Sequence, residues 1–403
     1  MRYGKTIHTP RSTQHADRTA DSSIGEISPL QLTCILSMFY GPPLAYAPIR
    51  IFNVAGHSGW IAGMLAGVFG MLIALLWVVT SLRFRGQSFP EYATATLGPV
   101  FGRLAILIVL FYFLSELLFD ARIISEVMVR LMPTSPLIVF VTMSLAFAVF
   151  VARRGPEVIG RLATFHGAVV ACAFVFTCAS VIPQVKPDLF LPILERGWLP
   201  VFNASITPTS FVGECIIVGM LIRHLSDPAS RDPSRDGRSY ANARFVKSAV
   251  VATVCGTALM WFYAQSLIVL TQGVIGATDA SRLGLPSLTL IRGIEIGTFI
   301  ERIESALVAV WMPAVMLKMC VFLYGAAQLV RHLVGAASFR SIVLALAALT
   351  VPASLGSSGP VLELIRLSNG AWSIYALFSQ VTPALLVLGV SAVKGASRRG
   401  SRA

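Results

Sequence analysis

The chain has 403 residues, of which 55% are hydrophobic and 13% charged, and its mean hydropathy is +0.75. Soluble domains typically carry about 25% charged residues, so the composition excludes an ordinary soluble protein and indicates a polytopic membrane protein. The net charge of +13 raises the possibility of nucleic-acid binding, which the distribution of the basic residues argues against below.

The N-terminal segment is polar, rich in Arg, Ser and Thr, and has no apolar core. We therefore predict a disordered cytoplasmic tail over residues 1–26 and not a cleaved signal peptide. Ten apolar segments follow, each long enough at 1.5 Å per residue to cross a hydrocarbon core of about 30 Å. They are residues 28–53, 59–82, 100–131, 134–152, 157–182, 205–225, 244–272, 299–334, 339–355 and 370–393. The predicted membrane domain spans 27–394, and a short basic cytoplasmic tail covers 395–403.

The basic residues are unevenly shared between the two sides of the predicted bundle. With the N-terminus inside, 22 of the 32 Lys and Arg lie on the cytoplasmic side, 8 lie on the opposite side, and Arg122 and Lys318 lie within spans. This asymmetry predicts that both termini are cytoplasmic. The basic character is thus mostly a matter of topology, with contact to anionic lipids as a secondary effect and no nucleic-acid partner.

Helix breakers interrupt the first and the sixth segment near their middles. The first reads Tyr40-Gly41-Pro42-Pro43, and the second contains Pro208 and Gly213 within residues 206–214. Proline removes a backbone donor and disfavours a continuous helix. Freed backbone groups at membrane depth must face protein or a water-filled cavity, and paired breaks of this kind indicate a midplane binding site. The alternative is a pair of proline kinks that only shape the bundle.

We expect half-helix N-termini at these breaks to receive a carboxylate and free carbonyls to receive an ammonium group, which together suit an amino acid. The predicted ligand-binding residues come from the two breaks and from one face of the third segment. They are Tyr40, Gly41, Pro42, Pro43, Tyr112, Glu116, Thr209, Ser210, Phe211, Gly213 and Glu214.

Several ionisable residues lie at predicted membrane depth. Tyr112, Glu116 and Asp120 share one helical face because they are spaced by four. For Glu214 three roles are open: it contacts a ligand amine, it titrates, or it accepts hydrogen bonds from backbone N–H groups. For Lys318 two are open: its ammonium extends to the membrane interface, or it neutralises Glu116 or Glu214. The charges to which we assign a structural role are Arg122, Arg161, Arg302 and Glu304.

In the second segment, Gly59, Gly63 and Gly67 recur at intervals of four. Small residues so spaced allow another helix to approach closely. We interpret them as packing inside the bundle, with a dimer interface as the alternative.

The six cysteines form no C-x-x-C pair and are interpreted as small buried hydrophobes. Because no nucleotide-binding, zinc or nucleophile-elbow motif occurs in a credible context, we expect neither an enzyme nor a cofactor or metal.

Several motifs, in this order along the chain, resemble one known family. They are Ile27-Ser28-Pro29-Leu30-Gln31, Ala55-Gly56-His57-Ser58-Gly59-Trp60, Phe89-Pro90-Glu91-Tyr92, Leu131-Met132-Pro133-Thr134-Ser135-Pro136, Gly155-Pro156-Glu157-Val158-Ile159-Gly160-Arg161, Phe211-x-Gly213-Glu214, and Glu301-Arg302-Ile303-Glu304 with Trp311. The chain resembles the spore germination permeases, the B subunits of nutrient germinant receptors, within the amino acid–polyamine–organocation transporter superfamily. It departs from them in its long N-terminal tail, an enlarged 226–243 loop and Gly160.

The resemblance implies an all-α, ten-helix fold in a five-plus-five inverted repeat of LeuT type, with discontinuous helices one and six. The repeats would cover about 27–182 and 205–394. It also implies a location in the spore inner membrane or cell membrane, and A-type and C-type receptor subunits as partners.

Three functions stay open at this point. The first is a receptor subunit that senses a small nutrient, which we expect to be an amino acid because of the complementary poles of the two breaks. The second is a proton- or sodium-coupled amino acid transporter, and the third is a membrane scaffold with a vestigial cavity. The fold alone does not choose between the first two.

Overall fold

The structure is a computed structural model that describes residues 26–226, 238–293, 303–335, 338–356 and 370–400. The side chains of residues 41–47, 238–242, 292, 303–308 and 395–400 lie outside this description. In chain order the elements are α2 (Pro29–Ser37), η2 (Met38–Tyr40), α3 (Gly41–Ala55), η3 (Gly56–Ser58), α4 (Gly59–Arg83), α5 (Phe89–Leu131), α6 (Leu137–Ala152), α7 (Pro156–Val181), η4 (Ile182–Gln184), η5 (Pro187–Phe190), α8 (Trp198–Val212), η6 (Gly213–Ile217), α9 (Val218–Leu221), η7 (Ile222–His224), α10 (Arg238–Ile275), α11 (Ala277–Arg282), α12 (Pro286–Arg292), α13 (Ile303–Val334), α14 (Phe339–Gly356) and α16 (Ala371–Gly400).

Each of the ten predicted spans coincides with one helix or with a run of consecutive helices. Within the described ranges, eight helical stretches are long and apolar enough to cross a membrane by themselves, and Pro29–Tyr40 and Leu137–Ala152 are shorter apolar helices. The third helix begins earlier than predicted. A capping box of Ser88 and Glu91 starts α5 at Phe89, and the chain kinks at Gly98, where φ is 84°.

The two interruptions are present, but they are tighter and lie at different positions from the predicted ones. In the first helix a 3₁₀ turn, η2, joins α2 to α3, and α3 resumes at Gly41. Pro42 and Pro43 occupy the first turn of α3, where proline is tolerated because those N–H groups have no helical partner. In the sixth helix α8 continues through Pro208, and the 3₁₀ segment η6 begins at Gly213.

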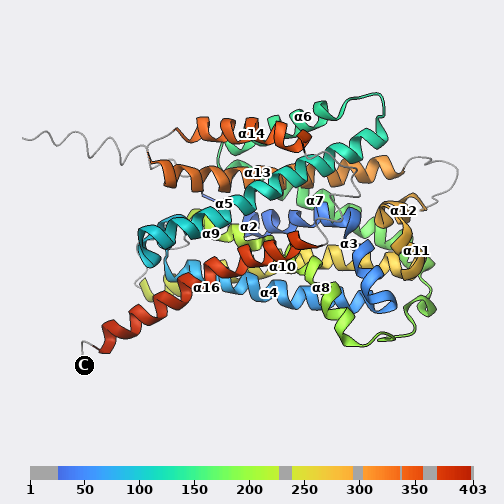
Figure 1. Ribbon diagram of the computed structural model, residues 1–403, viewed down its shortest axis with the longest axis horizontal. Helices are drawn as coiled ribbons and strands as arrows, with labels where there is room; N and C mark the ends of the chain where they lie inside the picture. The colour runs from blue at the N-terminus through green and yellow to red at the C-terminus, as the bar shows by residue number, and fades with distance from the viewer. Residues whose placement is uncertain (1–25, 227–237, 294–302, 336–337, 357–369, 401–403) are drawn as a thin grey trace, which may run out of the picture.

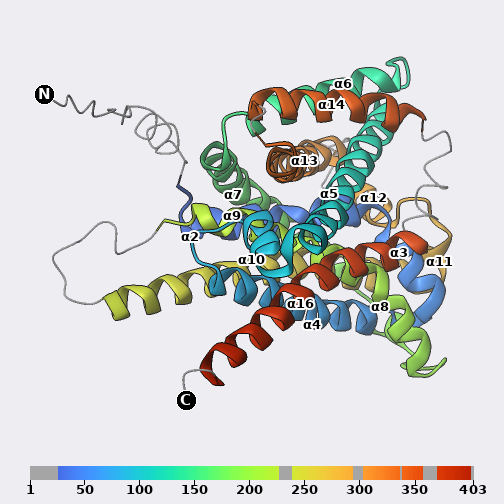
Figure 2. The ribbon, with the colours of Figure 1, turned by 60° about the vertical axis from the view of Figure 1, so that its left-hand side comes forward.

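The interrupted first helix lies in the interior of the bundle. In Figure 1 α2 and α3 run between α5 and α13 on one side and α4, α8 and α10 on the other. Figure 2 shows α6 and α14 packed side by side along one edge. Phe39 of η2 stacks on Phe322 of α13, with ring centroids 5.4 Å apart. The 3₁₀ turn of the first helix therefore belongs to the main hydrophobic core.

A parallel β-bridge between Ile27 and Leu225 closes one end of the bundle, which is the predicted cytoplasmic end. The backbone N–H of Ile27 donates to the carbonyl of His224 at 2.8 Å, and the N–H of Ser226 donates to the carbonyl of Ile27 at 2.9 Å. These two bonds tie the start of α2 to the end of the sixth helix. The first and sixth helices are thus held together at this end.

Polar side chains of α10 bond to backbone carbonyls of the glycine-rich helix α4. Trp261 Nε1 donates to the carbonyl of Gly63 at 2.9 Å, and Gln265 Nε2 donates to the carbonyl of Trp60 at 2.9 Å. A Cβ atom at Gly63 would collide with Gln265, and one at Gly67 would collide with Trp261. Both glycines therefore face a neighbouring helix of the same chain, while a Cβ at Gly59 would press on Phe52.

We predict that Gly63→Leu destabilises the fold by about 1–3 kcal/mol, the usual cost of overpacking, because the new side chain wedges α4 away from α10. The measurement is the amount of protein in the membrane together with its unfolding temperature in detergent. Gly389→Leu is the matched control, since Gly389 is a helical glycine with open space beside it. Equal levels and equal unfolding temperatures for the two variants would contradict the packing interpretation.

Candidate functional site

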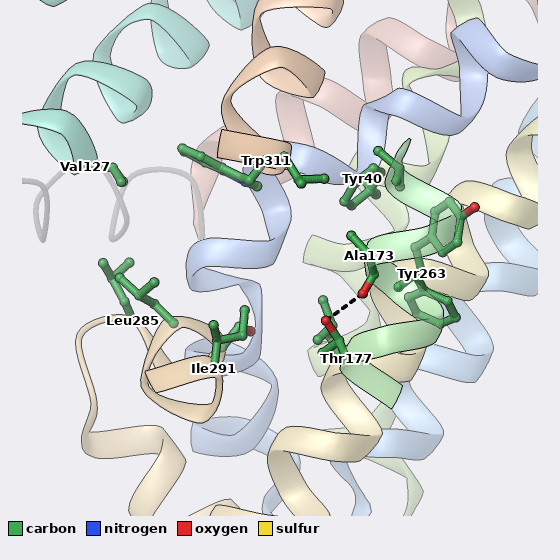
Figure 3. Close-up of a pocket in the computed structure, with 14 residues that line it drawn as sticks. Tyr40, Val127, Ala173, Thr177, Tyr263, Leu285, Ile291 and Trp311 are labelled. Carbon is green, nitrogen blue, oxygen red and sulfur yellow. Dashed lines mark hydrogen bonds between the residues drawn. The ribbon is translucent and has the colours of Figure 1, made fainter. Parts of the chain in front are cut away.

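A cavity of about 110 Å³, which we call cavity A, lies between α7, α10, α12 and the start of the described side chains of α13. Figure 3 shows Leu285 and Ile291 on one side of it, Ala173 and Thr177 opposite, and Tyr40, Tyr263 and Trp311 around the rest. An engineered cavity of about 150 Å³ accommodates benzene, so cavity A has room for a small solute group. Its complete lining is Tyr40, Val127, Val170, Ala173, Phe174, Thr177, Tyr263, Leu267, Leu285, Ser287, Leu288, Ile291, Val310 and Trp311.

A second, smaller cavity of about 30 Å³, cavity B, lies between the interrupted helices. This is about the volume share of one water molecule. Phe39 and Tyr40 border it from the first helix, and Pro208, Phe211 and Val212 border it from the sixth. The two interruptions therefore do enclose a space, although it is narrow in this conformation.

Tyr40, Leu267 and Ser287 line both cavities, so they form the wall that the cavities share. Tyr40 is the last residue of η2, and its ring meets that of Tyr263 edge-on with centroids 5.3 Å apart. The Ser287 hydroxyl is buried and has no hydrogen-bond partner among the described residues. A buried hydroxyl normally has a partner, so Ser287 can take one from a solute in either cavity.

Most of the wall of cavity A is hydrocarbon. Thr177 offers little to a solute, because its hydroxyl already donates to the carbonyl of Ala173 at 2.8 Å (Figure 3). The other polar side-chain groups on the wall are the phenols of Tyr40 and Tyr263, the hydroxyl of Ser287 and the indole N–H of Trp311. This composition suits a small molecule with an apolar part and few polar groups.

A buried amide joins the sixth helix to the third and tenth. Gln380 Nε2 of α16 donates to the Tyr112 hydroxyl at 2.8 Å and to the carbonyl of Ser210 at 2.6 Å. The indole of Trp77 donates to the carbonyl of Gln380 at 2.6 Å. A Cβ at Gly213 would collide with the Gln380 amide. Gly213 therefore leaves room for the amide at the point where α8 gives way to η6.

The four ionisable side chains at the centre of the bundle form one cluster, which we call the Lys318 cluster. Lys318 Nζ of α13 donates to Glu116 Oε2 at 3.0 Å and to Glu214 Oε1 at 2.8 Å, and it lies 3.3 Å from Asp120 Oδ1. All four side chains have 0% exposure. The ammonium also lies 5.4 Å from the centroid of the Phe322 ring. Of the two predictions for Lys318, the structure selects neutralisation of Glu116 and Glu214 over snorkelling.

The cluster connects three helices far apart in sequence. Glu116 and Asp120 lie one turn apart on α5, Glu214 lies on η6, and Lys318 lies on α13. An isolated charge at this depth is costly unless it is paired. The pairing therefore couples the interrupted part of the sixth helix to the third and eighth helices.

The structure divides the predicted ligand-binding residues into three groups. Tyr40 and Phe211 line the cavities, Tyr112, Ser210 and Gly213 surround the Gln380 amide, and Glu116 and Glu214 belong to the Lys318 cluster. Thr209 is buried and donates to the carbonyl of Ser205. Of Gly41, Pro42 and Pro43 the structure describes only the backbone, which forms the start of α3.

The second halves of the broken helices offer few free N–H groups for a carboxylate. Pro42 and Pro43 follow Gly41 directly at the start of α3 and have no N–H to donate. In the sixth helix, α9 has only four residues between two 3₁₀ segments. We expected carboxylate capture at these half-helix N-termini, and the observed backbone does not favour it.

Two of the predicted structural charges have partners. Arg122 pairs with Glu126 at 2.7 Å and donates to the carbonyl of Ser354 at 3.1 Å, and Arg161 pairs with Glu157 one turn away. Arg302 and the side chain of Glu304 lie outside the described residues.

Sequence reasoning missed the residues that α10, α12 and α16 bring to the site, above all Tyr263, Ser287 and Gln380. Gln380 carried a usable signal, because a lone amide inside an apolar span needs a partner at membrane depth. Tyr263 and Ser287 carried none. Only the packing of α10 and α12 against the first helix places them beside Tyr40.

Comparison with known proteins agrees with this architecture. The sequence model of the family described as "Spore germination protein" matches residues 26–358. Among curated Bacillus subtilis proteins, the chain is 26% identical to putative spore germination protein YfkT over 70% of this chain and 72% of that protein. It is 24% identical to spore germination protein B2, again over 70% and 72%.

Solved structures of the transporter Mhp1 share the fold. The chain superposes on Mhp1, a nucleobase-cation-symport-1 family transporter, in a closed conformation with bromovinylhydantoin bound, with a TM-score of 0.57 and 19% identity. The superposition covers 85% of this chain and 75% of Mhp1. This likeness confirms the predicted LeuT-type fold.

We predict that Lys318→Met destabilises the protein by about 3–5 kcal/mol, because it removes the one cation that pairs with these three carboxyl groups among the described residues. The measurement is unfolding of the purified protein in detergent. Lys394→Met is the control: Lys394, near the end of α16, donates to the carbonyl of Thr96, and the loss of that bond should cost about 1 kcal/mol. A Lys318→Met variant no less stable than the control would contradict a pairing role.

Proposed function

The chain belongs to the spore germination protein family, and we propose that it is the membrane subunit of a nutrient germinant receptor. In this proposal it binds a small nutrient, an amino acid in our expectation, in cavities A and B. It then signals germination through A-type and C-type partner subunits. We place it in the spore inner membrane with both termini in the cytoplasm.

The observation that carries the proposal is the position of Tyr40. It ends the 3₁₀ interruption of the first helix and forms, with Leu267 and Ser287, the common wall of the two cavities. A solute in cavity A would press on this wall, and displacement of Tyr40 would join cavity A to the space beside Phe211. Binding would therefore act directly on the interrupted parts of both helices.

The signal needs two conformations that bind the nutrient with different affinity. In the conformation described here, the β-bridge of Ile27 and Leu225 closes one end and cavity B is small. A nutrient that enlarges cavity B would favour a conformation in which the first and sixth helices separate. Partner subunits that contact the bundle would sense that change.

A secondary transporter is the second candidate, and the Lys318 cluster favours it, because buried ionisable groups at membrane depth often mark coupled transport. The two candidates are separated by uptake of a labelled amino acid into liposomes that contain this protein alone. Accumulation driven by an ion gradient indicates a transporter. Binding without accumulation supports the receptor.

The first test is a thermal-shift screen of the purified protein against amino acids, sugars and nucleosides. A ligand that binds only the native state raises its free energy of unfolding by RT ln(1 + [L]/Kd), and the unfolding temperature rises with it. We expect stabilisation by at least one amino acid. Stabilisation by a sugar or nucleoside alone would refute the amino acid class, and no stabilisation by any of them would refute nutrient binding by this subunit.

We predict that Ala173→Phe weakens binding of the strongest ligand from that screen by about tenfold or more, because the ring fills cavity A. Ala171→Phe is the matched control on the same helix, since Ala171 is exposed on the bundle surface. The measurement is the ligand concentration needed for half-maximal stabilisation. Equal affinity in both variants would show that the ligand does not occupy cavity A.

We also predict that Gly213→Val abolishes the nutrient response while the protein still inserts into the membrane. The new side chain collides with Gln380 and displaces the amide from Tyr112 and Ser210. The measurement is germination of spores that carry the variant, with immunoblotting of the membrane fraction. Gly389→Val serves as the control, and an undiminished response of Gly213→Val spores would contradict the proposed role of the junction.

A further inference from the structure

We propose that the Lys318 cluster is a proton-binding site that holds two protons in this closed conformation, which makes closure of the bundle proton-linked. The proposal is independent of the nutrient site and of the nutrient's identity. It rests on the charge balance and the unsatisfied oxygen atoms of the cluster.

The charge count comes first. One ammonium, that of Lys318, faces three carboxyl groups, those of Glu116, Asp120 and Glu214, and none of the four side chains is exposed. With all four groups ionised the cluster would carry a formal charge of −2. Such an excess is very costly in a low-dielectric interior. Two protons on the carboxyl groups make the cluster neutral.

The hydrogen bonds show the same imbalance. The ammonium donates to one oxygen of Glu116 and one of Glu214. Glu116 Oε1, Glu214 Oε2 and both oxygens of Asp120 lack a hydrogen-bond partner among the described residues. Asp120 is close to the ammonium but receives no hydrogen bond from it. A protonated carboxyl group gains a donor and loses its charge, so it is less costly to bury in this position than a carboxylate.

No other described cation supplies the missing charge. The nearest basic side chain along α5, Arg122, pairs with Glu126 and donates to the carbonyl of Ser354. The other titratable side chains that the described residues bring near Glu116 or Glu214 include Tyr112 on α5, Tyr375 on α16 and Cys215 on η6, and all three are uncharged in their protonated forms. The counter-charge therefore has to come from protons or from a bound cation.

The geometry favours protons over a metal ion. In the described part of the chain, no group of three or more His, Cys, Asp or Glu side chains has the arrangement that holds a metal. The ammonium of Lys318 already occupies the position that is within 3.3 Å of all three carboxyl groups. A second cation there would meet its repulsion.

Proton binding would link the cluster to movement of the sixth helix. Glu214 lies on η6, directly after the junction at Gly213, whereas Glu116 and Asp120 lie on the continuous helix α5. Separation of η6 from α5 and α13 would take Glu214 away from Lys318. The Lys318 ammonium would then balance the charge of fewer carboxyl groups. The number of bound protons would change with the conformation.

The test measures reversible SDS-induced unfolding of the purified full-length protein in dodecylmaltoside between about pH 5 and pH 8.5. At these values unfolded Asp and Glu side chains are ionised. If the folded protein holds two extra protons, stability is greatest at low pH and falls as pH rises. Each proton changes the unfolding equilibrium constant about tenfold per pH unit. The two protons should therefore give about a 100-fold increase per unit.

Neutral variants of the acids should reduce that dependence. Asp120→Asn removes one proton site, so its unfolding constant should change about tenfold per pH unit. Glu214→Gln is a second variant with the same expectation, which keeps the test valid if one variant misfolds. Glu157→Gln is the control, because the Glu157–Arg161 pair is exposed, and it should keep the wild-type dependence.

Two outcomes would overturn the proposal. One is a pH dependence that is identical in wild type, Asp120→Asn and Glu214→Gln. The other is a saturable stabilisation by sodium or potassium, relative to choline at constant ionic strength. If Asp120→Asn abolished that stabilisation, the cluster would bind a cation and not protons.

Infrared difference spectra give an independent readout. A carboxylic acid C=O band that disappears in Asp120→Asn supports the proposal, and carboxylate bands alone contradict it.

Discussion

The structure depends on one buried ion cluster at the centre of the bundle. Lys318 of α13 holds carboxyl groups from α5 and η6 with none of the four side chains exposed. The hydrophobic effect contributes little to contacts among these helices in a membrane, because lipid is as apolar as the side chains. The ammonium of Lys318 lies within 3.3 Å of all three carboxyl groups, so the cluster fixes how close the interrupted sixth helix lies to the third and eighth helices. The two cavities and the hydrogen bonds of Gln380 to Tyr112 and Ser210 lie around this cluster.

The two interruptions are 3₁₀ segments and not fully unwound stretches of chain, and the cause lies in the local backbone. A 3₁₀ turn satisfies most backbone groups by tightening the turn, so little free backbone is exposed at membrane depth. The prolines of the first helix stand at the start of α3, where their missing N–H groups cost nothing. As a result the side chains of Tyr40, Phe211 and Ser287, more than open backbone groups, form the walls of the space between the helices.

Cavity A shares α5 and α13 with the Lys318 cluster, and cavity B shares the sixth helix with it, but the cavities and the cluster differ in chemistry. Cavity A is nearly all hydrocarbon, whereas the cluster concentrates every fully buried charge in the described core. Gln380 lies between these regions, since it bonds to Tyr112 on the helix of the cluster and to Ser210 on the helix of cavity B. This amide offers a route by which a solute between the broken helices would affect the buried charges.

The sequence by itself determined the membrane class, the apolar helical segments, eight of which are long enough to span a membrane in the described residues, and the positions of the two interruptions to within about a turn. It could do so because hydropathy, proline and glycine act locally. The family resemblance added the inverted-repeat fold, which the superposition on Mhp1 confirms. Tyr112, Glu116 and Asp120 could be assigned to one face from their spacing alone.

Only the tertiary structure decided which residues meet. Lys318 lies more than 100 positions from Glu214 and more than 200 from Glu116 in the chain, and no periodicity specifies such a pairing. The same holds for Tyr263 and Ser287, which reach Tyr40 because α10 and α12 pack against the first helix. Long-range contacts of this kind depend on how the helices are arranged in three dimensions, and local sequence patterns do not encode that arrangement.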